Sequence, residues 1–229
     1  MHHHSDHHGH HGHHHHTFSV FDGPSNAWDA AWAALTRSAF ALDSVSDDPV
    51  IQPLARRVSA ALHEWSEIES RRLQLRTATL AIAARIRVAD AALDHRIESL
   101  ANVVIASHGG RDGARYKSLF PEPHEGIVAL GLDAEVPAAT LVLSELERTQ
   151  NLPADLAEEL EPLRTALQVS NRALVERGEV YASLGSLQAR VEAWLDSARV
   201  LREHVESELG VIAKTRGLPS RWIDALSGG

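Results

Sequence analysis

The sequence predicts an all-α protein, an elongated antiparallel helical hairpin or coiled-coil bundle of two long helices with short flanking helices. Alanine and leucine dominate the chain, while aromatic residues make up only 5% of it. Two long stretches carry apolar residues at a 3.5-residue repeat, and glycine and proline gather in the segment between them. Long helices with apolar seams bury those seams against one another. The pattern leaves open whether they pair as a hairpin or across a dimer.

The first predicted helix covers residues 26–45. Its apolar side chains, from Trp28 to Ala39, recur at the spacing of one helical face. The stretch SVSDDPV then ends it. Asp47 or Asp48 can cap the next helix, and the proline that follows suits a first turn.

The next helix is predicted over residues 49–108 and carries the strongest signal. Two seam sets run every seventh residue, from Ile51 and from Leu54, and thirteen of their sixteen positions are apolar. The exceptions are Arg72, Thr79 and Arg96. A repeat held over eight heptads is typical of a coiled coil. This helix is expected to end near His108, Gly109 and Gly110, where a glycine can take the left-handed C-cap conformation.

Residues 109–136 are predicted to be the main loop because they are rich in glycine and proline. A short helix is expected over 137–149, followed by a second long helix over 153–215. Two seam sets in the second long helix start at Leu156 and Leu160, and thirteen of their seventeen positions are apolar.

A last short helix is predicted over 219–226, before a flexible tail at 227–229. Residues 1–17 are expected to form a disordered, histidine-rich arm. Residues 18–226 are then expected to fold as a single helical domain.

The composition excludes several classes of function. A formal net charge of -9 argues against nucleic-acid binding, which needs a basic surface. The chain has no cysteine, so disulfides, cysteine nucleophiles and zinc–thiolate sites are excluded. No apolar run is long enough to span a membrane, and no signal-peptide core is present. We therefore expect a soluble, cytoplasmic protein without nucleic-acid or membrane partners.

The N-terminal segment MHHHSDHHGHHGHHHH holds eleven histidines in sixteen residues. Neutral imidazoles on a flexible chain bind nickel, zinc or copper with little selectivity. The segment is either native or an affinity tag, and the interruptions at Ser5, Asp6, Gly9 and Gly12 favour a native segment. The candidate metal ligands are His2, His3, His4, His7, His8, His10, His11, His13, His14, His15 and His16.

A second candidate site lies in the main loop, where Arg111, Arg115 and Lys117 surround a tyrosine. These cations could contact an anion or an acidic partner. The alternative, which we favour, is that they complement a helix C-terminus while Leu119 and Phe120 plug the end of the bundle.

No pattern of catalytic residues emerges, and we expect the chain not to be an enzyme and to require no cofactor. A carboxylate-bridged di-iron site needs paired Glu-x-x-His motifs, and the sequence contains none. His63 with Glu67 and His204 with Glu208 lie four residues apart, which suits either chelation or ordinary exposed pairs.

The stretches RDGARYKSLFP and LPSRWIDAL, set around two long heptad helices, give the chain a resemblance to other proteins. It resembles uncharacterised long-helix, coiled-coil proteins of GC-rich, myxobacteria-like bacteria over most of residues 50–226. The resemblance implies a helical architecture and a bacterial source, and no activity is known for that group.

Taken together, these features predict a non-enzymatic coiled-coil module with a structural or protein-interaction role. It would carry an N-terminal arm that binds divalent metals, and its helical seams would bind a protein partner or a second copy of the chain. The alternative is a metal-handling protein that buffers or delivers nickel, zinc or copper and whose helical body displays the arm.

Overall fold

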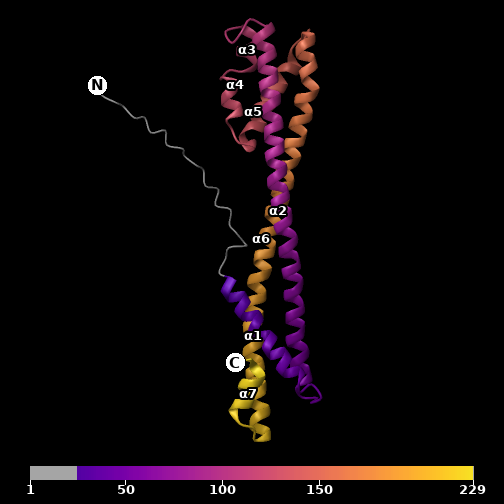
Figure 1. Cartoon of the computed structure of the whole chain (residues 1–229), viewed down its shortest axis with the longest axis vertical. Coiled ribbons are helices and arrows are strands. Elements are labelled where there is room, and N and C mark those ends of the chain that lie inside the picture. Colours follow the sequence, from indigo (N-terminus) through magenta and orange to yellow (C-terminus); the bar gives the residue numbers. More distant parts are fainter. Residues whose placement is uncertain (1–24, 229) are drawn as a thin grey trace, which may run out of the picture. The chain divides into compact units, whose positions relative to one another are not determined.

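The computed structural model describes residues 25–228, and every regular element in this range is a helix (Figure 1). The predicted all-α class is therefore confirmed for the described residues, in which two long helices, α2 and α6, pack together. The histidine-rich arm lies outside the described residues. The helices are α1 (Ser25–Asp43), α2 (Gln52–Ser107), α3 (Ala114–Leu119), α4 (His124–Val128), α5 (Leu132–Arg148), α6 (Ala154–Arg216) and α7 (Ser220–Ser227).

The chain divides into two compact units. The first unit comprises residues 25–62 and 195–228 of the described chain, and the second unit comprises residues 63–194. The long helices contribute to both. The sequence-based expectation of a single domain stays a prediction.

In the first unit, α1 packs against α7. The hydroxyl of Ser38 donates a hydrogen bond to the carbonyl of Ser227, and Arg37 Nε donates to the carbonyl of Gly228 at 3.1 Å. The carboxylate of Asp48 accepts a hydrogen bond from the Val50 amide at 3.0 Å, in agreement with its expected capping role. Asp48 also binds the Arg216 guanidinium, which holds the pKa of this carboxyl at about 2.

In the second unit, polar pairs join α2 to α6 in opposite order along the two helices. Glu67 accepts a hydrogen bond from Arg190 at 2.8 Å, and Arg85 donates to Glu176 at 2.6 Å. Farther along α2, the Ser99 hydroxyl donates to the Glu159 carboxylate at 3.1 Å. Residue numbers thus rise along α2 as those of its partners fall along α6.

The two helices meet around a pair of tryptophans. The ring centroids of Trp65 and Trp194 lie 4.4 Å apart with the rings tilted by 36°, and both side chains are buried. Aromatic pairs with this separation add favourable interaction to the area that they bury.

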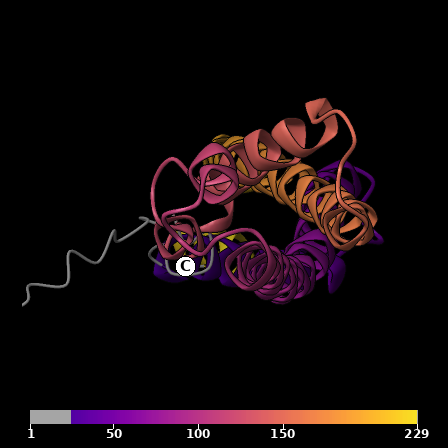
Figure 2. The ribbon, with the colours of Figure 1, turned by 90° about the horizontal axis from the view of Figure 1, so that it is seen from above.

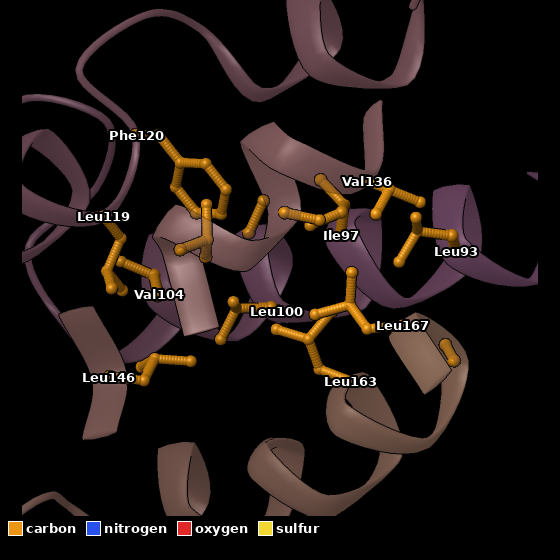
Figure 3. Packing of buried hydrophobic residues seen from close by; sticks show 14 of the residues in the cluster. Leu93, Ile97, Leu100, Val104, Leu119, Phe120, Val136, Leu146, Leu163 and Leu167 are labelled. Atoms are coloured by element: carbon orange, nitrogen blue, oxygen red, sulfur yellow. The ribbon is translucent and has the colours of Figure 1, made fainter. Parts of the chain in front are cut away.

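The buried residues of α2 follow the predicted seam as far as Ala89, with Leu75 and Ile82 among them. Beyond this point the buried face is wider and includes Ile97 and Val104, which the heptad sets leave out. The reason is that α3 and α5 cover a second side of the helix there (Figure 3). Seen from above, the short helices lie beside α2 and α6 and together with them surround the core (Figure 2).

The seam of α6 differs from the prediction in its middle. Tyr181, a predicted seam residue, is 47% exposed, whereas Leu187 and Trp194 are buried. The seam set that starts at Leu156 faces the core as far as Val191, as predicted. In the middle of the set that starts at Leu160, the more buried residue is the one before the predicted residue. The set from Leu156 keeps its seven-residue spacing over the same stretch, so the difference is a choice between two adjacent positions and not a drift of the repeat.

The predicted main loop at 109–136 instead contains α3, α4 and the start of α5. The sequence-based reading placed Pro137 at the start of a helix, but α5 begins at Leu132, five residues earlier. Its start is stabilised by burial of Leu132 and Val136 against the core. The predicted cap at Gly109 is confirmed, because this residue follows α2 with a left-handed φ of 89°.

Candidate functional site

The three basic residues of the second candidate site each contact a different group of the chain. Arg111 binds the carboxylate of Glu125, which raises the pKa of the guanidinium. Arg115 donates to the hydroxyl of Thr149 at 3.1 Å. Leu119 and Phe120, beside them, are buried in the core, as the plug interpretation predicts.

Lys117, the third basic residue, lies with its Nζ atom 3.6 Å from a carboxylate oxygen of Asp112. The three cations therefore hold three separate partners in place. An incoming anion would have to compete with Glu125 and Asp112 for two of them.

The two histidine–glutamate pairs lie at ion-pair distance on the helix surface. His63 Nε2 is 3.7 Å from Glu67, and His204 Nε2 is 3.8 Å from Glu208. Within residues 25–228, no group of three or more histidine, aspartate or glutamate side chains is arranged to hold a metal ion. In the same range, no helix is both long and apolar enough to cross a membrane.

A further surface, which the sequence-based reading did not single out, is an apolar stripe on α2 that we call the outer face. All of its members are exposed, with Leu73, Leu80 and Val88 at 59%, 68% and 70%. The spacing repeats every three to four residues, so the members share one side of the helix, roughly opposite the seam at Leu75 and Ile82. The outer face consists of Leu73, Thr77, Leu80, Ala84, Val88 and Ala91.

The helix around the outer face is basic. Between residues 71 and 88 the chain has five arginines and no acidic residue. Arg72 binds Glu69, and Arg85 binds Glu176. Arg76 and Arg87 are exposed and border the outer face. The surface is thus apolar with a positive rim.

A shallow apolar groove of about 300 Å³ adjoins the outer face between α2 and α6. Ala84 and Val88 of α2 line it, together with Val169 and Ala173 of α6. The Arg85–Glu176 pair also belongs to its lining. Together with the groove, the apolar surface extends from the outer face of α2 onto part of α6.

On α6, a stripe of mostly small side chains forms what we call the small face. Its members are exposed, and a Cβ atom placed on Gly178 or Gly185 would meet no other atom within 4 Å. Glu179 and Glu192, also exposed, border this stripe. The small face consists of Val175, Gly178, Ala182, Gly185 and Ala189.

A third feature is buried and acidic, and we call it the carboxyl cluster. Asp90 and Asp94, one turn apart on α2, lie close to Glu135 of α5. Glu135 is fully buried, and neither of its carboxylate oxygens accepts a hydrogen bond from an amide, amine or hydroxyl group of the described residues. One oxygen of each aspartate is likewise buried without such a partner.

This environment favours the neutral acid. Burial, and then the negative charges of Asp94 and Asp90, raise the pKa of Glu135 to about 8. Burial also raises the pKa of Asp94. The cluster was not predicted from the sequence, because Glu135 was expected to lie in a loop. The two aspartates beside the α2 seam were the signal that the sequence offered.

The chain matches no known family model, and no curated protein or solved structure is detectably similar to it.

Proposed function

We propose that this chain is a non-enzymatic, cytoplasmic helical module whose long helices form an antiparallel coiled coil. It acts by associating with a second copy of itself through the outer face of α2. The observation that carries the proposal is the exposure of Leu73, Leu80 and Val88 on a helix that already buries its opposite side. Helices that are apolar on all sides are normally covered on all sides.

A second copy provides a matching surface in its small face. The outer face of α2 projects leucine and valine side chains, whereas the small face of α6 is flat and open above Gly178 and Gly185. Small residues let a neighbouring helix approach closely. Both faces extend over about four to five helical turns.

The charges at the rims support the same pairing. Arg76 and Arg87 border the outer face, and Glu179 and Glu192 border the small face. Pairing two outer faces would instead bring arginines together, which disfavours a symmetric contact. Because the two faces differ, the contact is heterologous, and copies can be added beyond the dimer.

The expected affinity is modest. Burying a leucine or valine side chain contributes about 1.5–3 kcal/mol, and the loss of translational and rotational freedom offsets much of the sum. We therefore expect association at micromolar concentrations and above.

Leu80→Glu is expected to abolish this association, because it places a charge in the centre of the outer face. Sedimentation equilibrium of the full chain across a concentration series measures the effect. The wild type should gain average mass with concentration, and the variant should keep the mass of one chain. Leu141→Glu is the matched control, because Leu141 is 73% exposed on α5 and lies outside both faces.

Ala182→Arg tests the partner surface separately. It adds bulk and a like charge where the arginine-rimmed face would dock, so it should also abolish association. If Leu80→Glu prevents association and Ala182→Arg does not, the outer faces pair with one another. A wild type that stays monomeric throughout the series overturns the proposed function.

The histidine-rich segment favours a second candidate function, metal handling. Eleven imidazoles in sixteen residues provide many ligands for nickel, zinc or copper. Titration calorimetry with nickel or zinc should show binding to the full chain that is absent from a chain beginning at residue 17. Identical isotherms would exclude a metal-binding role for the segment.

A further inference from the structure

The carboxyl cluster sits where a short helix joins a long one. Asp90 and Asp94 belong to α2, and Glu135 lies in the first turn of α5. Leu132 and Val136, which lie near Glu135 in the sequence, are part of the buried core. Figure 3 shows Val136 in this core. An ionised Glu135 would therefore place a negative charge at the apolar contact that holds α5 in position.

No cation of the described residues pairs with Glu135. Arg177 of α6, the basic residue bound to this part of α5, holds both carboxylate oxygens of Asp133. Glu98, one turn beyond Asp94 on α2, adds a further negative charge near the cluster. On α6, Ser170 is buried, but its hydroxyl has no partner.

Three polar or charged groups that pack near α5 are engaged with other partners. Arg115 of α3 donates to Thr149, and the Ser118 hydroxyl donates to Glu145. In α4, the ring of His124 is hydrogen-bonded to the Tyr116 hydroxyl at 2.9 Å. Among the described residues, no cation is paired with the cluster, so a bound proton is what reduces its negative charge.

We propose that Asp90, Asp94 and Glu135 form a proton-binding latch: a proton held by the cluster keeps α5 seated on α2, and loss of that proton releases α5. The carboxyl groups of Asp94 and Glu135 are close enough to hydrogen-bond once one of them is protonated. Such a bond satisfies oxygens that have no other donor. After deprotonation, two like charges face each other in an apolar contact.

The latch makes the opening of α5 depend on pH. In the open state Glu135 ionises near its ordinary pKa of 4.5, whereas in the closed state its pKa is about 8. The open state therefore binds fewer protons between these values, and the opening equilibrium rises about tenfold per pH unit across this window. Above pH 8 the increase levels off.

The direct test is the titration of Glu135 in the full chain. Carbon NMR of the labelled side-chain carboxyl should show a midpoint near pH 8 in the wild type. Asp94→Asn removes a neighbouring charge and should move the midpoint to lower pH. A wild-type midpoint in the ordinary carboxyl range overturns the latch, and so does a midpoint that Asp94→Asn leaves unchanged.

Hydrogen exchange measures the release itself. After correction for intrinsic rates, the protection of α5 amides should fall about tenfold per pH unit from pH 6 to 8 in the wild type. Amides of α6 around Trp194 should keep their protection. Glu135→Gln should remove the pH dependence from α5, whereas the exposed control Glu179→Gln should retain it. Equal pH dependence in wild type and Glu135→Gln overturns the latch.

Discussion

Trp194→Ala is expected to lower the free energy of unfolding by about 3–5 kcal/mol. The side chain is 2% exposed and stacks on Trp65 with ring centroids 4.4 Å apart. Its removal loses buried apolar area and leaves a cavity between α2 and α6 that the long helices cannot readily close. Urea unfolding followed by circular dichroism measures the loss.

Trp32→Ala is the matched control, because Trp32 is 44% exposed on α1. Its removal should cost about 1 kcal/mol or less, which is ordinary for a substitution near the surface. Equal losses for the two tryptophans would contradict the account of the α2–α6 packing.

Glu135→Gln is expected to stabilise the protein near pH 8 by on the order of 4 kcal/mol. The wild-type carboxyl is held neutral in the folded state and ionises on unfolding. Its pKa is raised from 4.5 to about 8, so the stability of the wild type falls as pH rises through this window. The amide of glutamine has nearly the same shape, carries no charge and can donate to Asp94.

Urea unfolding at pH 5 and at pH 8 measures this difference. Near pH 5, the stabilities of wild type and Glu135→Gln should differ by less than about 1 kcal/mol, because pH 5 lies only half a unit above the pKa of 4.5 that Glu135 has in the unfolded chain. The difference between their free energies of unfolding should increase as pH rises. Glu179→Gln should follow the wild type at both values, since Glu179 is exposed. A Glu135→Gln variant that is less stable than wild type at pH 8 contradicts the proposed protonation state.

The buried residues of α2 were predicted correctly where α2 and α6 pack only against each other. Leu75 and Ile82 are buried, as their seven-residue spacing predicts. A repeat read from one helix contains no information about a third helix, so the burial of Ile97 and Val104 was not foreseen. The seam of α6 was misassigned around Tyr181 because apolar residues stand at adjacent positions, as Trp194 and Leu195 do, and the spacing alone does not show which of the two is buried.

The candidate sites were harder to predict than the fold. Because residues 109–136 are rich in glycine and proline, they were predicted to be a loop. The position of Glu135 in the first turn of α5 was therefore not predicted. The outer face of α2 was hidden for a different reason. The heptad pattern identifies the one side of α2 that is buried. That Leu73, Leu80 and Val88 form a second, exposed apolar stripe is known only from their exposure in the structure.

The most direct test of self-association is disulfide trapping between two copies. The chain contains no cysteine, so single substitutions introduce the only thiols. Leu80→Cys and Ala182→Cys variants, mixed and oxidised gently, should form a covalent dimer that joins residue 80 of one copy to residue 182 of the other. A mixture of Leu141→Cys and Ala182→Cys sets the background. The yield of the 80–182 dimer should be well above that background. An equal yield, or dimers joined only through two copies of residue 80, would contradict association of the outer face with the small face.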